Sequence, residues 1–473
     1  MGLDEREPRP PSEKGPPPPG PGPEPGPGSA TADAQHRYPS PRRAWWVTAL
    51  LTLIFVFSFI DRQILNLLVG PIQQDLGLND TQISLLQGLG FVATYVLLSV
   101  PIGRLVDTRG RLAIIAGGVA IWSVATAACG LARSFGALFV ARAGVGIGEA
   151  TLTPAAWSLL ADYFPPQRRS LPFSIFLMGP YLGVGAAMLL GSAIMNALDT
   201  RAPVELPLVG ALAAWQLTFL IVAAPGVLLT LLVMLAPEPP RQGLSPTATA
   251  QAAPLADVVA WVGRHARIYT ALLIGTPCIV LVLYGLQAWA PSYLLRVHGM
   301  SLSEAGARYG LIALTAGSLG VLCGPFAARA LERRGYQGAE LRIVMLALLL
   351  ICPGLAGLAL APNAAVALAC IALVSFLVPL PLALVATAVQ AVTPNRMRGV
   401  VVGTYVVTNN VIGLALGPSL VALVTDYVFA DPHAVGQSLA IVGTAVAALG
   451  IALVARGLAP FRALLESPQR SAT

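Results

Sequence analysis

The chain has 473 residues, of which 56% are hydrophobic and only 11% are charged, and its formal net charge is +7. Soluble domains carry about 25% charged residues, so this composition excludes an ordinary soluble protein and places most of the chain in a lipid bilayer. A positive charge can also indicate a nucleic-acid partner. The arginines, however, lie between apolar segments, which is how membrane proteins set their topology, and we expect no nucleic-acid partner.

Residues 1–43 are rich in proline, glycine and glutamate. A segment of this kind buries too little apolar surface to offset the entropy of folding, so we expect a disordered tail. It is also too polar to be a cleavable signal peptide.

Twelve apolar segments follow, separated by short polar loops. A helix needs about 20 apolar residues to cross a bilayer, and the strands of a membrane barrel are much shorter than these segments. The sequence therefore predicts an all-α membrane protein with twelve transmembrane helices, near 44–70, 82–104, 111–132, 135–160, 169–196, 213–236, 268–295, 302–330, 341–361, 363–392, 398–428 and 434–458.

The longest loop, residues 237–267, divides the spans into an N-terminal bundle (44–236) and a C-terminal bundle (268–458), which a tail (459–473) follows. Its last part, 255–267, has the pattern of an amphipathic helix at the membrane surface. Two loop motifs of the first half recur in the second half at similar separations. The motif at 103–111 recurs at 324–335, and the motif at 165–169 recurs at 394–398. Such a repeat predicts two pseudo-symmetric six-helix bundles.

The arginines of the loops indicate the orientation. One set of loops holds Arg104, Arg109, Arg111, Arg168, Arg169, Arg241, Arg264, Arg267, Arg329, Arg333, Arg334, Arg342, Arg396 and Arg398, and the opposite set holds only Arg133, Arg201, Arg296 and Arg308. The positive-inside rule then predicts that the first set and both termini are cytoplasmic.

Ionisable residues inside predicted spans are concentrated in the first half. Asp61 lies in the first span, while Arg142 and Glu149 lie seven residues apart on one face of the fourth. A charge at the bilayer centre costs about 3 kcal/mol, so we expect these residues to form one functional polar site. A rise of 1.5 Å per residue puts Asp61 and Arg142 at one depth and Glu149 near the midplane.

We expect Arg142 to hold Asp61 or Glu149 by charge-assisted hydrogen bonds, which leaves the other acid readier to bind a proton. Exchange of the arginine between the two acids, or its loss to an anionic substrate, would load or release a proton. The alternative is a static salt bridge between the first and fourth spans.

The motifs of the first half resemble those of a known family. Gly103-x-x-x-Asp107-x-x-Gly110-Arg111 is similar to the loop signature of the major facilitator superfamily, and the run from Arg142 to Glu149 is similar to its helix-4 motif. Within the superfamily, the segments 59–62 and 179–185 most resemble the Spinster family, which is associated with proton-linked export of lysolipids. Anion–cation symporters share a similar helix-1 pair and helix-4 motif.

The resemblance implies a major facilitator fold and alternating access, with Gly103, Asp107 and Arg111 as gating residues. In this role, Asp107 faces the positive N-terminus of a neighbouring helix; topology control by the arginines alone is the alternative. In the second half no ionisable residue lies well inside a span, so its cavity depends on uncharged polar groups. The possible cavity-lining residues are Arg62, Tyr181, Tyr284, Gln287, Gln390, Asn409 and Asn410.

Taken together, the sequence predicts a monomeric proton-coupled transporter of an amphipathic or anionic organic molecule in a bacterial inner membrane. A symporter of small organic anions such as sugar acids, a drug efflux pump and a non-transporting receptor-like protein remain alternatives. No cofactor or metal is expected, because the five cysteines and four histidines form no ligand pattern. An ATP-driven pump is disfavoured because no phosphate-binding Gly-x-x-x-x-Gly-Lys-Ser/Thr loop occurs. No Ser–His pair at a common depth suggests an enzyme.

Overall fold

A computed structural model describes residues 2, 38–165, 168–198, 203–207, 210–241, 254–394 and 397–466. Most of the predicted N-terminal tail lies outside these ranges, as do Arg201 and Arg396. Twelve helices of the described residues are long and apolar enough to cross a membrane, which confirms the predicted number and type of spans.

The first half contains eleven of the described helices and a short hairpin. Their bounds are α2 Pro41–Leu67, α3 Val69–Leu76, α4 Asp80–Gln87, α5 Leu89–Thr108, α6 Arg111–Gly130, α7 Phe135–Glu149, α8 Leu152–Tyr163, α9 Ser170–Leu177, α10 Gly179–Ala197, β1 Val204–Leu206, β2 Gly210–Leu212, α11 Ala214–Ala223 and α12 Pro225–Met234. The antiparallel β1–β2 hairpin was not predicted, because three-residue strands leave no periodic signal.

The second half follows in the same way, with four π-helical segments, η2 to η5. The bounds are α13 Leu255–Arg264, α14 Ala266–Thr270, η2 Ala271–Gly275, α15 Pro277–His298, α16 Leu302–Ile312, η3 Ala313–Gly317, α17 Ser318–Arg333, α18 Ala339–Leu360, α19 Ala364–Leu377, α20 Leu382–Val392, α21 Arg398–Thr408, η4 Asn409–Ala415, α22 Leu416–Leu423, η5 Val424–Phe429, the 3₁₀ turn η6 Pro432–Ala434 and α23 Val435–Glu466.

Several spans are interrupted where proline removes a backbone donor. The fourth span breaks between α7 and α8, just before Pro154, and the fifth breaks between α9 and α10 at Pro180. Proline interrupts the i to i−4 hydrogen bonds and kinks a helix. The break after α7 falls directly after Glu149, in the middle of the predicted site.

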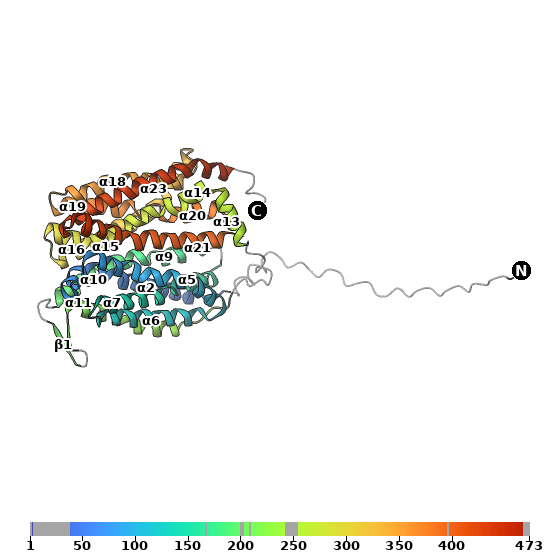
Figure 1. Ribbon diagram of the computed structural model, residues 1–473. Coiled ribbons are helices and arrows are strands. Elements are labelled where there is room, and N and C mark those ends of the chain that lie inside the picture. The colour runs from blue at the N-terminus through green and yellow to red at the C-terminus, as the bar shows by residue number, and fades with distance from the viewer. Residues whose placement is uncertain are drawn as a thin grey trace.

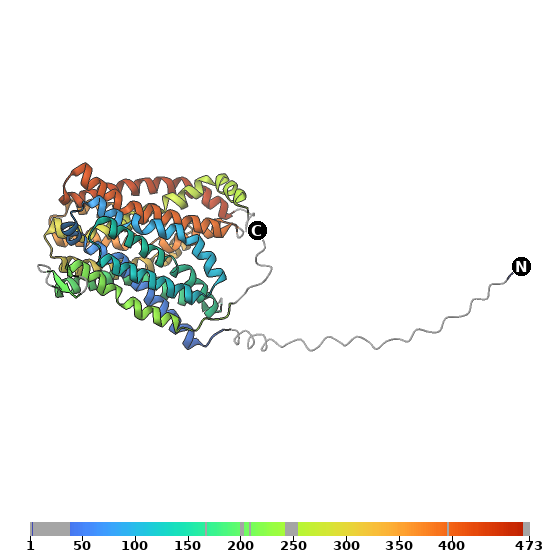
Figure 2. The ribbon, with the colours of Figure 1, turned by 60° about the horizontal axis from the view of Figure 1, so that its bottom comes forward.

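The halves form two stacked layers, with the helices of the first half below those of the second (Figure 1). The β1–β2 hairpin marks one end of the molecule, called here the hairpin end. The opposite end carries α13, the start of α2 and the last turn of α23, and is called the arginine-rich end (Figures 1 and 2).

The halves pack on each other toward the hairpin end. There α10 packs against α16 and α4 packs against α22. A Cβ atom on Gly310 of α16 would lie 2.8 Å from Met188 Cβ of α10, and one on Gly88 would lie 2.6 Å from the Leu414 carbonyl oxygen. Contacts this close need glycine, so these positions fix the approach of the two halves.

Candidate functional site

Four charged side chains are buried together in the first half. Asp61 and Arg62 come from α2, and Arg142 and Glu149 come from α7. Their exposed fractions are 3%, 9%, 1% and 2%, respectively. Two acids and two arginines balance in charge, which lowers the cost of burying any one of them.

Glu149 is paired with Arg62. The Arg62 Nη2 group donates to Glu149 Oε2 in a short ion pair, and both side chains are buried. The guanidinium carbon of Arg62 also lies 4.5 Å from the ring centroid of Phe59 and 4.2 Å from that of Phe91. These aromatic faces add cation–π attraction and hold Arg62 against Glu149.

Arg142 forms different contacts from those expected. Its Nε donates to the Leu86 carbonyl oxygen at 3.3 Å, and its Nη1 donates to the backbone carbonyl of Asp61 at 3.2 Å. The predicted carboxylate partner of Arg142 is therefore wrong: Glu149 turns to Arg62, and Arg142 binds main-chain oxygens. The contact with Asp61 agrees with the predicted equal depth of these two residues. Counting residues along a helix gives depth, but it does not show which arginine faces the acid.

Asp61 has one neutral partner, since Thr126 Oγ1 donates to its Oδ2 at 3.2 Å. Four buried polar atoms of this cluster, one from each charged residue, have no hydrogen-bond partner among the described residues: Asp61 Oδ1, Arg62 Nε, Arg142 Nη2 and Glu149 Oε1. Most buried polar atoms in proteins are satisfied, so this concentration indicates a site that receives another polar group.

Glycines of α7 bring its backbone against two neighbouring helices. A Cβ atom on Gly146 would lie 2.4 Å from the Phe91 carbonyl oxygen of α5, and one on Gly148 would lie 2.6 Å from the Gly118 carbonyl oxygen of α6. Small residues allow such close helix packing in membrane bundles. This packing also places Glu149 close to the ring of Phe91 that supports Arg62.

A polar bridge connects this cluster to the second half. Gln63, which follows Arg62, accepts from Asn66 Nδ2 at 2.6 Å and donates from its own Nε2 to Gln287 Oε1 of α15 at 2.9 Å. Asn66 also donates to the Gln287 carbonyl oxygen at 3.2 Å. The predicted cavity residue Gln287 thus makes interhelical hydrogen bonds.

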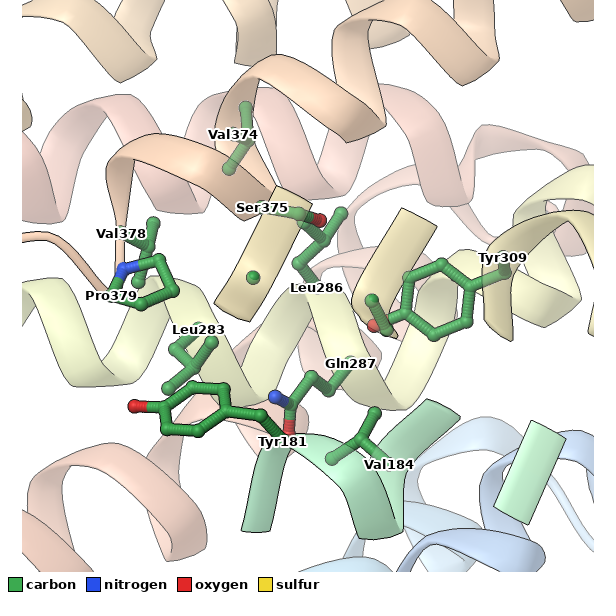
Figure 3. Close-up of a pocket in the computed structure, with 12 residues that line it drawn as sticks. Tyr181, Val184, Leu283, Leu286, Gln287, Tyr309, Val374, Ser375, Val378 and Pro379 are labelled. Carbon is green, nitrogen blue, oxygen red and sulfur yellow. The ribbon is translucent and has the colours of Figure 1, made fainter. Parts of the chain in front are cut away.

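Gln287 also lines a cavity between the halves, together with Tyr181 and Val184 of α10. Figure 3 shows Tyr181 and Val184 beside Leu283, Leu286 and Gln287 of α15, with Tyr309 and Ser375 farther along the lining. Most of the lining is apolar, and the space for a water-sized sphere is about 20 Å³, about enough for a single water. The predicted cavity position of Tyr181 agrees with this lining, whereas Tyr284 packs against the hydrophobic cores of both halves.

The remaining predicted cavity residues lie elsewhere on the second half. Gln390 is exposed near the end of α20, and its carbonyl accepts from Arg398 at 3.2 Å. Asn409 and Asn410 begin the π-helical segment η4. Asn410 donates to the Val406 carbonyl of its own helix at 2.9 Å, while Asn409 Oδ1 is buried without a partner among the described residues.

Two predicted gating residues, Gly103 and Asp107, lie in the last two turns of α5, before the loop that leads to α6. A Cβ atom added to Gly103 would meet nothing within 4 Å, so space does not require glycine there. The side chain of Asp107 lies outside the described residues. Its predicted contact with a helix N-terminus therefore stays a prediction.

The third predicted gating residue, Arg111, is fully buried and binds groups of the first half and of the following linker. It forms ion pairs with Asp162 and with Glu238, and Nη2 donates to the Pro239 carbonyl oxygen at 3.0 Å. The Glu238 carboxylate also accepts from the Arg111 backbone N–H at 2.8 Å. A carboxylate at a helix N-terminus is stabilising, so Arg111 and Glu238 anchor the linker to α6.

A latch that the sequence analysis missed joins the halves at the hairpin end. Arg296 at the end of α15 donates to Asp80 of α4 through Nη1 at 2.6 Å and Nη2 at 2.7 Å. In the reverse direction, Asp426 of η5 accepts from the backbone N–H of Thr81 at 2.7 Å and from its hydroxyl at 2.6 Å. We call these four residues the hairpin-end latch. These residues lie near the ends of their helices, and the sequence gave no signal of pairing across 216 and 345 residues.

Comparison with known proteins gives a consistent result. The sequence model of the Major Facilitator Superfamily matches residues 51–418. An MFS-type efflux pump of Mycolicibacterium smegmatis is 34% identical over 298 residues, which are 62% of this chain and 65% of that protein. Protein spinster of Drosophila melanogaster is 25% identical over 331 residues, which are 68% of this chain and 52% of that protein. The chain thus spans between about half and two thirds of these curated relatives.

A solved structure is similar to this chain over a larger share of both chains than these relatives are. It is a bacterial homologue of the human lysosomal transporter Spinster in an inward-facing and unoccupied conformation, with a TM-score of 0.74 and 26% identity, over 90% of this chain and 98% of that one. In the described residues, no three His, Cys, Asp or Glu side chains gather as metal ligands. The chain belongs to the Major Facilitator Superfamily, is an integral multi-pass membrane protein, and is similar to proteins of the Spinster type.

Proposed function

We propose that this transporter couples proton movement to the movement of an amphipathic or anionic organic molecule, with Glu149 as the proton carrier. The observation that carries the proposal is the buried pair of Arg62 and Glu149 beside Arg142, which has no carboxylate partner among the described residues. Two arginines and two acids in one buried cluster give a site where an arriving charge must rearrange the existing pairs.

The coupling follows from the charge balance. An anionic group that binds Arg62 draws the guanidinium away from Glu149 and leaves this carboxylate buried and unpaired. Burial disfavours the charged form, so Glu149 takes up a proton. The anion and the proton then add no net charge to the cluster, and the two are loaded together. Arg142, with Nη2 unpartnered among the described residues, is the first contact for the anion.

Alternating access requires that the two ends open in turn. In this conformation the hairpin-end latch and the packing of α10 on α16 hold one end shut. By the positive-inside rule the opposite, arginine-rich end faces the cytoplasm, together with both termini. The likeness to an inward-facing structure supports this assignment. We place the protein in a bacterial inner membrane, as a monomer.

The substrate class is inferred from the side chains that the two halves offer to a bound molecule. The first half offers charged groups, and the cavity around Gln287 is lined mostly by apolar side chains of α15, α16 and α19. This combination suits a molecule with a charged head and an apolar body. The similarity to spinster proteins and to an efflux pump supports export of such molecules.

Proteoliposomes with an imposed pH gradient test the coupling. We expect uptake or release of a lysophospholipid to depend on the gradient and to stop with a protonophore. Glu149→Gln should abolish the gradient dependence. Glu304→Gln is the matched control, because it makes the same chemical change at an exposed acid of the second half. Normal gradient-driven transport by Glu149→Gln would overturn the proposal.

The same assay separates the alternatives. A sugar acid transported in place of the lysophospholipid would identify a small-anion symporter, and a cationic dye would identify a drug efflux pump. Binding of any of these molecules without proton flux would indicate a receptor-like protein.

A further inference from the structure

A second cavity lies at the arginine-rich end, far from the charged cluster. It is formed where α13 turns into α14 and faces the last turns of α23, and its volume is about 590 Å³. Figure 1 shows α13 beside α14 at this end of the bundle. The lining residues are Gly263, Arg264, His265, Ala266, Arg267, Ile268, Pro460, Ala463 and Leu464.

The charged side chains that line this cavity are all positive. Arg264 and Arg267 are both exposed, and none of the nine lining residues carries a carboxylate. In the described part of the chain neither arginine forms an ion pair, in contrast to Arg62, Arg111 and Arg296, which pair with acids. Two cations on the wall of one cavity therefore lack a counter-charge from the described protein.

The position of Arg264 is fixed by neighbouring groups. The guanidinium carbon of Arg264 lies 5.6 Å from the ring centroid of Trp261, and its Nε donates to the Ala260 carbonyl at 3.4 Å. The Trp261 indole in turn donates to the Tyr269 hydroxyl at 2.9 Å. This chain of contacts holds the end of α13 against α14, so the cavity has a defined wall.

The helix α13 has the form of a helix at a membrane surface. Leu255, Val258, Val259 and Val262 recur at helical spacing on one side. Val258 is buried against the second half, but Leu255 and Val259 are 66% and 64% exposed. The next residues, from Ala266, begin the seventh membrane span, so α13 lies at the level of the bilayer boundary. There its apolar side enters the region between head groups and acyl chains.

We propose that this cavity binds the head group of an anionic glycerophospholipid from the bilayer leaflet at the arginine-rich end. The apolar side of α13 inserts at the membrane surface beside the lipid. Arg264 and Arg267 supply positive charge for the phosphate of the lipid head group. Basic pockets at this level of a membrane protein bind anionic lipid head groups. The lipid then joins the linker helix to the end of α23.

The experiment uses the full chain, extracted from vesicles of phosphatidylcholine mixed with phosphatidylglycerol and examined by native mass spectrometry. The wild-type protein should retain phosphatidylglycerol in preference to phosphatidylcholine. Arg264→Ala with Arg267→Ala should reduce this retention about tenfold or more. Arg329→Ala with Arg333→Ala is the matched control, because it removes two arginines from α17 toward the same end of the molecule, and it should retain the lipid.

The two single variants, Arg264→Ala and Arg267→Ala, should each lose part of the retention, so the test does not depend on the double variant folding. Thermal unfolding supplies a second measurement: added phosphatidylglycerol should raise the unfolding temperature of the wild type and of the control pair, but not that of the double variant. Equal retention by all variants would overturn the proposal. So would complete displacement of the lipid by inorganic phosphate, which would show a site for a soluble anion.

Discussion

The two halves of the transporter share a six-span arrangement but bury different chemistry. Every buried charged side chain among the described residues lies in the first half, between Asp61 and Asp162. The π-helical segments of the described chain, η2 to η5, all lie in the second half. A π-helical turn holds an extra residue and is common at functional sites. The charged groups that the proposed proton coupling requires therefore lie in the first half, while the second half supplies uncharged side chains and an irregular backbone.

The largest expected effect concerns the charges of the first half. Arg62→Met leaves Glu149 buried without its partner, and removal of one member of a buried pair costs about 3–5 kcal/mol. We expect a large fall in the unfolding temperature and loss of transport, measured by thermal unfolding in detergent and by flux in proteoliposomes.

A double variant distinguishes stability from function. Arg62→Met with Glu149→Leu removes both charges, and such replacements are often neutral or stabilising. We therefore expect wild-type stability without proton-coupled transport. Coupled transport by this folded double variant would show that Glu149 does not carry the proton.

The next effect concerns helix packing in the first half. Gly148→Ala would place its Cβ 2.6 Å from both the Gly118 carbonyl oxygen and the Trp122 backbone nitrogen, and backbone atoms cannot rotate away. We expect a loss of about 1–3 kcal/mol in stability, seen as a lower unfolding temperature. Gly403→Ala in α21 meets nothing within 4 Å and should leave the unfolding temperature unchanged.

A smaller effect is expected at the latch between the halves. Asp80→Arg should weaken closure of the hairpin end by placing two cations together, and Asp80→Arg with Arg296→Asp should restore it. Maleimide labelling of Ser419→Cys, which faces Ser84 across the halves at 3.4 Å, reports closure when the five native cysteines are replaced by serine. Faster labelling in the single variant and recovery in the exchanged pair are the expected results. Labelling that is the same in all variants would exclude a gate here.

The smallest effect on coupling is expected in the second half. Asn409→Ala removes a buried oxygen with no partner among the described residues, at the start of η4. We expect a changed transport rate but the same number of protons per substrate, measured as the ratio of the two fluxes. A changed ratio would place part of the proton chemistry in the second half.

Much of the fold could be predicted from the sequence, because apolar length alone identifies a membrane helix. The twelve spans are examples, because most of their ends lie within a few residues of the prediction. An exception is α23, which continues to Glu466. The burial of Asp61, Arg142 and Glu149 was also predictable, since a charge inside an apolar span is too costly to face lipid and turns to the bundle interior.

The pairing of these charges was not predictable in the same way. Asp61 and Arg62 are neighbours about 100° apart on a helix, and only the packing of α2 against α5 and α7 shows that Arg62 faces Glu149. The latch and the anchor at Arg111 depend on contacts between residues far apart in the sequence. No periodicity within one segment reports such contacts.

The separation of Arg62 from Glu149 has a consequence for synthesis of the chain. The two residues are 87 positions apart, so α2 enters the membrane before its partner has been made. At about 5–20 residues per second, the ribosome takes about 4 to 17 s to supply Glu149. During that interval the first helix must hold an arginine and an aspartate in or near the bilayer without α7. The second half buries no charged side chain among its described residues. It is synthesised after the first half, when Arg62 and Glu149 can already have formed their ion pair.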